Sequence, residues 1–164
     1  MKSHRNPKHL FLIALALCAP LVYGCSDNPA DGTPDGEYAE IENSIHAKIN
    51  AYRASKGLPA LSQVSVMVTQ ARLHSSSMVS RNSLDHNGFE DRVEEIQKSV
   101  AIGSAAENVA FNGGFADPAE EAVQGWLGST GHRTNIEGDY NVTGIGVERN
   151  AAGDYYFTQI FGKR

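Results

Sequence analysis

Cysteine is scarce in this chain, and both copies lie near its N-terminus. Of the 164 residues only Cys18 and Cys25 are cysteines. Residues 26–164 therefore cannot form a disulfide, and they offer neither a thiolate metal ligand nor a cysteine nucleophile. This absence excludes a disulfide-stapled extracellular fold and a cysteine-dependent enzyme in that part of the chain.

The sequence also lacks an excess of positive charge and a long hydrophobic run. It holds 14 Lys and Arg residues against 19 Asp and Glu residues, which gives a formal charge of −5. There is no basic stripe, so nucleic acid is not expected as a partner. The apolar run at residues 10–19 is too short to cross a bilayer as a helix.

Residues 1–24 resemble a bacterial lipoprotein signal peptide. Basic residues precede the apolar run, and the sequence L-V-Y-G-C at 21–25 resembles a lipobox. The resemblance implies cleavage before Cys25 and acylation of its thiol. The exported protein would then be anchored to a membrane surface of the cell envelope, with the outer membrane as one option. A simple signal peptide with an incidental cysteine is the alternative.

The remaining chain predicts a tether followed by one folded domain. Residues 25–37 are rich in Pro, Gly, Asp and Ser, and we expect a flexible tether there. Residues 38–164 form the expected domain. Apolar periodicity predicts helices at about 38–56, 65–81, 90–97 and 117–128.

The C-terminal third predicts a small sheet. Residues 141–148 and 155–161 are rich in β-branched and aromatic residues and flank a turn at 150–153, which is typical of an antiparallel hairpin. A short apolar run at 99–103 is expected to form a strand. Glu107, among small and apolar residues at 104–112, is expected to be either solvent-exposed in a loop or paired. Helices followed by a small antiparallel sheet indicate an α+β layered domain.

The stretch 126–136 joins an anchored helix end to an ionisable side chain. Asp117 as the cap and Pro118 at the first helical position begin this helix, and the chain's only Trp anchors its apolar face. Two glycines then end the helix, so His132 is expected just past a rigid helix end. His132 is a candidate site residue, with a structural role in the turn as the alternative.

Three ionisable side chains stand in expected turns or loops: His86, Glu107 and His132. Two imidazoles and a carboxylate suit a divalent metal such as zinc, or acid–base chemistry. Their spacing has no local signature, and the chain contains no H-E-x-x-H, G-x-S-x-G or phosphate-binding glycine motif. Three separately solvated side chains are the alternative. His74 lies on the apolar stripe of the second expected helix and is expected to be a core residue.

The order of several short motifs resembles one protein family. In chain order they are N-A-Y-R at 50–53, G-L-P-A-L at 57–61, A-x-x-H-S-x-x-M at 71–78, His86, D-R-V at 91–93, E-N-V-A at 107–110, W-L-G-S-T-G-H-R-T-N-I at 126–136, G-I-G-V at 144–147 and Y-F-T-Q-I-F at 156–161. Over residues 41–162 this order resembles the CAP superfamily (cysteine-rich secretory proteins, antigen 5, pathogenesis-related 1), in its bacterial SCP-domain branch. The resemblance implies an α-β-α sandwich with a small antiparallel sheet between helices and a central cleft.

The resemblance also implies a set of cleft residues. In many members two His and two acidic residues line the cleft and can hold a divalent ion. By position, three of them fall on His86, Asp91 and Glu107. Glu90 is a rival for the place of Asp91, because the loop after His86 is short. Eukaryotic members place the second His where this chain has Tyr156, so we infer that His132 supplies the second imidazole.

Two functions follow from these expectations. The first is an exported, lipid-anchored and non-catalytic envelope module, whose cleft binds a lipid, a cell-wall component or a protein partner, with or without a divalent ion. The second is a metal-dependent extracytoplasmic hydrolase of the peptidase type, in which a zinc ion activates water and Glu107 acts as the base. We favour the first function because the sequence shows no recognisable nucleophile, and a fold does not decide a function.

Overall fold

The computed structural model describes residues 34–164, with side chains from Gly36 onward. Its elements in chain order are α1 (Pro34–Ser55), β1 (Ser62–Gln63), α2 (Ser65–Arg81), α3 (Phe89–Gln97), β2 (Ser104–Asn112), α4 (Pro118–Gly128), α5 (Thr130–Glu137), β3 (Val142–Arg149) and β4 (Tyr155–Lys163). The expected signal peptide, Cys25 and most of the expected tether lie outside the described residues. Within residues 34–164, no helix has both the length and the apolar character needed to span a membrane.

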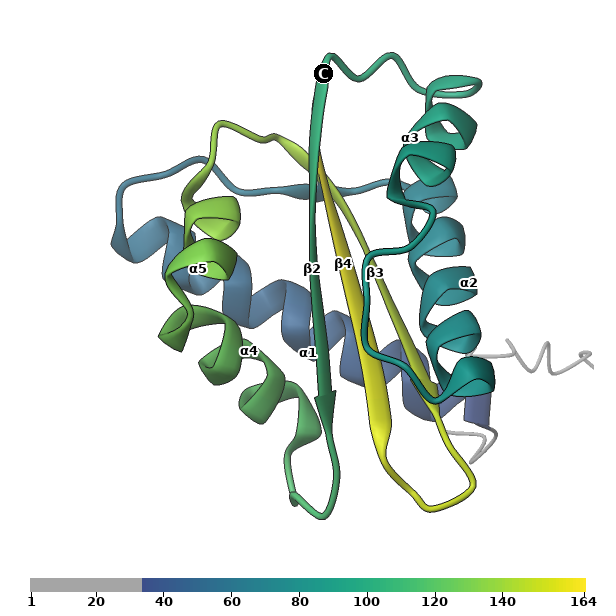
Figure 1. Ribbon diagram of the computed structural model, residues 1–164. Coiled ribbons are helices and arrows are strands. Elements are labelled where there is room, and N and C mark those ends of the chain that lie inside the picture. The colour runs from purple at the N-terminus through teal and green to yellow at the C-terminus, as the bar shows by residue number, and fades with distance from the viewer. Residues whose placement is uncertain (1–33) are drawn as a thin grey trace, which may run out of the picture.

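The fold is the expected α-β-α sandwich, with a four-stranded sheet in the middle (Figure 1). The strand order is β1-β3-β4-β2. β4 pairs antiparallel with both β2 and β3, whereas the short β1 pairs parallel with β3, so the sheet is mixed. α1, α4 and α5 cover one face and α2 covers the other (Figure 1). β2 lies at one edge of the sheet, between α5 and the segment that leads to α3.

Two helix starts show how closely the structure follows local signals. α2 has the predicted bounds, and Asp117 caps α4 by accepting a hydrogen bond from the Glu120 N–H at 2.9 Å. α1 begins at Pro34, inside the segment that was expected to be tether. Proline at a first helical position has its φ angle already set for a helix, which favours this earlier start.

The main correction concerns residues 99–112. The predicted strand at 99–103 is wrong, because these residues form an irregular connection. The expectation that Glu107 stands in a loop is wrong as well, because residues 104–112 form β2, which pairs with β4 along all nine residues. Pairing with a buried neighbour overrides the weak strand preference of Ala, Asn and Glu. Side chains alternate along a strand, so Glu107, Val109 and Phe111 share one face of β2.

A second correction concerns the residues after α4. His132 was expected in a turn, but it lies in the first turn of a further helix, α5. Ser129 is extended and separates the two helices, and its carbonyl then accepts the Arg133 N–H at 2.9 Å. α4 thus ends at Gly128, whereas Gly131, the second predicted helix stop, lies inside α5.

A buried arginine ties α1 to the segment between α5 and β3. The Arg53 guanidinium is almost fully buried. It donates hydrogen bonds of 2.6 to 3.0 Å to four carbonyl oxygens, those of Pro59, Ile136, Gly138 and Tyr140. These bonds fix the C-terminal end of α5, and with it the helix that carries His132.

Two glycines let α2 approach β3 at backbone distance. A Cβ added at Gly144 would lie 2.1 Å from the backbone carbon of Met67, and one at Gly146 would lie 2.1 Å from the backbone nitrogen of Arg72. The close approach lets the Ser75 hydroxyl donate to the Gly146 carbonyl at 2.9 Å. The close approach also fixes how far His74, the residue before Ser75, lies from the sheet.

Replacing Gly146 with Ala is expected to destabilise the domain by at least about 2 kcal/mol, because α2 must move away from β3. Gly125→Ala is the matched control: it lies in α4, and an added Cβ would meet nothing within 4 Å. That change is expected to be neutral or to stabilise by up to about 1 kcal/mol, since Ala favours a helix over Gly. Urea unfolding measures both, and equal effects would contradict the close packing.

Candidate functional site

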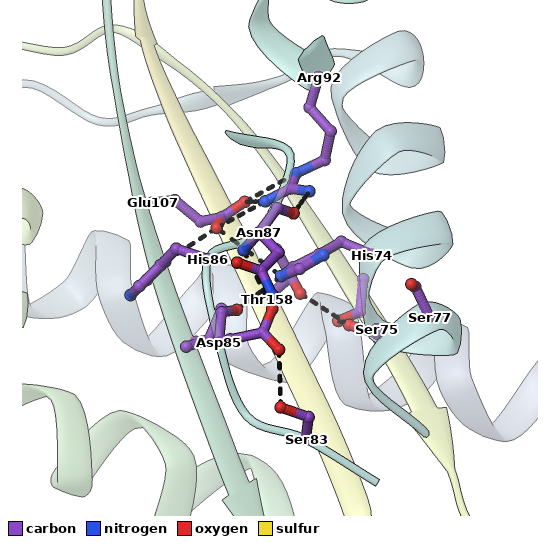
Figure 2. Close-up of polar contacts among 12 residues, drawn as sticks. His74, Ser75, Ser77, Ser83, Asp85, His86, Asn87, Arg92, Glu107 and Thr158 are labelled. Carbon is purple, nitrogen blue, oxygen red and sulfur yellow. Dashed lines mark hydrogen bonds and ion pairs between the residues drawn. The ribbon is translucent and has the colours of Figure 1, made fainter. Parts of the chain in front are cut away.

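Glu107 lies in the middle of β2, and its carboxylate is buried with a side-chain exposure of only 2%. Three side chains from three different segments reach it: His86 from the loop after α2, Arg92 from α3 and His74 from α2. Figure 2 shows them converging on the carboxylate. A buried carboxylate is costly unless it is paired and hydrogen-bonded, so these neighbours decide its state.

The Arg92 guanidinium donates hydrogen bonds to both carboxylate oxygens of Glu107. Its Nη2 lies 2.8 Å from Oε1 and 2.7 Å from Oε2, and its Nε lies 3.0 Å from Oε2. The remaining nitrogen, Nη1, donates to the Asn87 carbonyl at 2.7 Å. The Arg92 side chain is only 9% exposed. This forked contact neutralises the buried charge and ties α3 to the loop that carries His86.

His86 is the exposed member of the group. Its Nδ1 lies 2.9 Å from Oε1 of Glu107, and its side chain is 51% exposed. Because a carboxylate only accepts hydrogen bonds, Nδ1 carries the hydrogen whether the ring is neutral or protonated. Nε2 is therefore the nitrogen left for contact with another molecule.

Asp85 fixes the loop that presents His86. Its carboxylate accepts hydrogen bonds from the Arg81 side chain at 2.6 and 3.1 Å, from the Ser83 hydroxyl at 2.7 Å and from the Asn87 N–H at 3.0 Å. These donors, Arg81 first, hold the pKa of the Asp85 carboxyl well below its usual range. The loop then enters α3 through Gly88, whose φ of 73° suits glycine.

His74 is buried as expected, but it lies against the site rather than in a purely apolar core. Its Nε2 is 2.8 Å from the Asp85 carbonyl and 3.9 Å from Oε1 of Glu107. Burial lowers its pKa, which favours the neutral ring. A carbonyl accepts, so Nε2 carries the hydrogen. The apolar stripe of α2 predicted that His74 is buried. Its contact with Glu107 was not predictable in this way, because that contact depends on the pairing of β2.

His132 reaches the same edge of the sheet from the opposite layer. Its carbonyl accepts a hydrogen bond from Asn108 Nδ2 at 3.1 Å, and Asn135 Nδ2 bonds to Asn108 Oδ1 at 2.9 Å. Partial burial lowers the pKa of His132, and the nearby His86 lowers it further. The two imidazoles are thus within electrostatic range. Within residues 34–164, the His132 side chain makes no hydrogen bond to Glu107.

The two rival acids, Asp91 and Glu90, both lie on the first turn of α3, at its outer surface. Neither makes an ion pair or hydrogen bond with the site in the described part of the chain, and the residue that does is their neighbour Arg92. The sequence analysis missed Arg92 because the D-R-V motif at 91–93 was interpreted through its acidic residue, Asp91. Tyr156 is buried and donates its hydroxyl hydrogen to Asn82 Oδ1 at 3.1 Å.

Among residues 34–164, no three His, Cys, Asp or Glu side chains are arranged to hold a metal ion. The zinc assignment therefore stays a prediction.

The chain is similar to known proteins over most of its length. A family model described as the CAP, cysteine-rich secretory protein family, matches residues 46–161. The uncharacterized membrane protein YlbC of Bacillus subtilis is 34% identical over 141 residues, which cover 79% of this chain and 38% of that protein. The uncharacterized protein YkwD of the same organism is 34% identical over 125 residues, 74% of this chain and 47% of that protein. The chain thus spans less than half the length of these curated relatives.

Two solved structures from other bacteria have a similar fold. An extracellular protein containing an SCP domain from Bacillus anthracis is 28% identical with a TM-score of 0.67, over 80% of this chain and 44% of that chain. An outer surface protein from Borrelia burgdorferi is 20% identical with a TM-score of 0.66, over 76% of this chain and 93% of that chain. The second likeness bears on the fold alone.

The lowered pKa values of His74 and His132 predict a domain that loses stability in mild acid. Below the ordinary His pKa of about 6.5 the unfolded chain binds protons that the folded chain resists, so unfolding is favoured as pH falls. We expect the free energy of unfolding to be lower at pH 5.5 than at pH 7.5. In His132→Gln this difference should be smaller. Urea unfolding at both pH values tests this, and an unchanged difference in the variant would contradict it.

Proposed function

The chain belongs to the CAP family, and we propose that it is a non-catalytic binding module of the cell envelope whose ligand contacts the exposed His86 beside β2. The main support for this proposal is that an exposed imidazole is held in place by buried side chains. His86 is half exposed, yet it is held by a buried carboxylate, a buried guanidinium and a fixed loop. A preorganised exposed group on a rigid base is what recognition requires, because little order has to be gained on binding.

The same geometry disfavours catalysis. Both oxygens of Glu107 accept hydrogen bonds from Arg92, so this carboxylate is not free to act as a base. In the part of the chain that the structure describes, no hydroxyl hydrogen-bonds to His86, and residues 26–164 contain no thiol. An activated nucleophile needs such a contact. We therefore propose binding rather than hydrolysis.

The surroundings of His86 favour a ligand that is partly polar, uncharged and partly apolar. Arg92 and Glu107 cancel each other's charge, and the lowered pKa of His132 favours its neutral ring. Leu84, two residues before His86, is 50% exposed, and Phe111 on the same face of β2 as Glu107 is 47% exposed. A lipid or a cell-wall component matches this mixture.

Several observations support an envelope location. Residues 21–25 resemble a lipobox, and acylation of Cys25 would anchor the domain to a membrane. YlbC is described as a membrane protein, and the Bacillus anthracis protein as extracellular.

Ligand binding is tested by imidazole NMR on residues 26–164, with envelope lipid vesicles and soluble cell-wall fragments as separate probes. We expect one probe to shift the His86 and His132 signals and to leave His46 unmoved, since His46 lies on α1 against the Leu61 carbonyl. His86→Ala should weaken binding at least about tenfold, and His46→Ala should not. Binding that is equally strong in both variants would place the site elsewhere.

Anchoring is tested by Cys25→Ser in the full chain. We expect wild-type protein to sediment with membranes and to carry acyl chains detectable by mass spectrometry. The variant should appear in the soluble extracytoplasmic fraction, because a serine hydroxyl does not replace the acylated thiol. Membrane association that survives the substitution would reject the lipid anchor and leave the cleft proposal untouched.

A further inference from the structure

Arg92 occupies the position beside Glu107 where a divalent ion bound to that carboxylate would have to lie. An ion shared by His and acidic ligands needs free oxygen lone pairs on the carboxylate. On Glu107, Oε1 accepts from Arg92 at 2.8 Å and from His86 at 2.9 Å, and Oε2 accepts from Arg92 at 2.7 and 3.0 Å. A metal ion could bind this carboxylate only after displacing the guanidinium.

Neither neighbouring imidazole points a lone pair at Glu107. His86 turns its Nδ1–H toward Oε1, so any lone pair of that ring is on Nε2, on the far side. His74 uses its Nε2–H for the Asp85 carbonyl. Both rings therefore meet Glu107 as hydrogen-bond donors, so neither ring can share with Glu107 an ion that is bound to that carboxylate.

The charges of Glu107 and Arg92 also disfavour a divalent ion at this position. The buried pair of Glu107 and Arg92 is already neutral, and both side chains are less than one-tenth exposed. A divalent ion placed beside them would face the positive guanidinium in a poorly screened environment, where like charges repel strongly. The residues of this chain therefore do not fit a divalent ion next to Glu107.

We propose that Arg92 is the resident cation of this cleft and a positioning residue for His86. Its guanidinium neutralises Glu107, orients the carboxylate that holds Nδ1 of His86, and holds the loop through the Asn87 carbonyl. Glu107 then holds His86 without a divalent ion beside it. A forked guanidinium is suited to this role because one group bonds both carboxylate oxygens and a third acceptor. The inference goes beyond the proposed function, since it holds whatever the ligand is.

The first test measures metal dependence on the full-length chain in a mild detergent. Samples are treated with a chelator or titrated with zinc, and the melting temperature and the imidazole signals of His86 and His74 are followed. A metal bound at this site would raise the melting temperature by several degrees, because it would bind only the folded state. We expect no such rise and no shift of either signal at one equivalent of zinc. Melting that falls with the chelator, or His86 signals that move with zinc, would overturn the proposal.

The second test removes the guanidinium. Arg92→Gln leaves a buried carboxylate without its partner, and we expect its melting temperature to fall by roughly 10 °C or more. Methylguanidinium at millimolar concentration should restore part of this loss, whereas ammonium at the same ionic strength should not. Arg149→Gln is the matched control, since Arg149 is exposed at the far end of β3. A loss no larger than in Arg149→Gln, or equal recovery with both ions, would overturn the proposal.

A third variant covers the case in which Arg92→Gln does not fold. Arg92→Lys keeps the positive charge but replaces the fork by a single ammonium group. We expect it to fold, to melt below the wild-type chain and to show disturbed His86 signals. Wild-type melting and unchanged His86 signals would show that the fork is not needed. These experiments use no envelope ligand, so their failure is distinct from a failure of the binding proposal.

Discussion

A carboxylate cannot remain charged inside a protein without a partner, and β2 places Glu107 in that position. Arg92 supplies the partner, and almost every other feature of the site follows from this contact. The guanidinium ties α3 to the loop after α2, the loop carries His86, and the carboxylate fixes which nitrogen of His86 faces outward. The exposed imidazole is therefore the outer end of a buried network.

The fold brings this network together from distant segments. Gly144 and Gly146 let α2 sit directly on β3, which sets His74 beside Glu107. On the other layer, Arg53 fixes the end of α5, and Asn108 bonds the His132 carbonyl across the edge of β2. His74 and His132 thus approach the edge strand β2 from opposite faces of the sheet. A sheet edge flanked by two layers is a place where a ligand can be contacted from both sides.

Local patterns in the sequence predicted four of the five described helices, all but α5, because capping residues and apolar stripes act within a few residues. The Asp117 cap, the bounds of α2 and the C-terminal hairpin are of this kind. β2 was missed because its residues have weak strand preference and gain their structure from β4, which comes more than forty residues later. The pairing of Arg92 with Glu107 was missed for a related reason: it depends on where β2 lies, and no spacing in the sequence encodes it. Residue type and context singled out His86, Glu107 and His132, and the family resemblance gave cleft positions to His86, Asp91 and Glu107. The geometry explains why Arg92 matters beside them.

The most direct measurement of the central claim is the position of the hydrogen on the neutral His86 ring. Nitrogen-15 NMR of the imidazole side chains, recorded on the full chain at a pH where the ring is neutral, reports this position. We expect the hydrogen on Nδ1, held by Glu107, with Nε2 unprotonated and free of metal. A hydrogen on Nε2, or an Nδ1 without a hydrogen, would contradict the network in which Arg92 and Glu107 present His86 to a ligand.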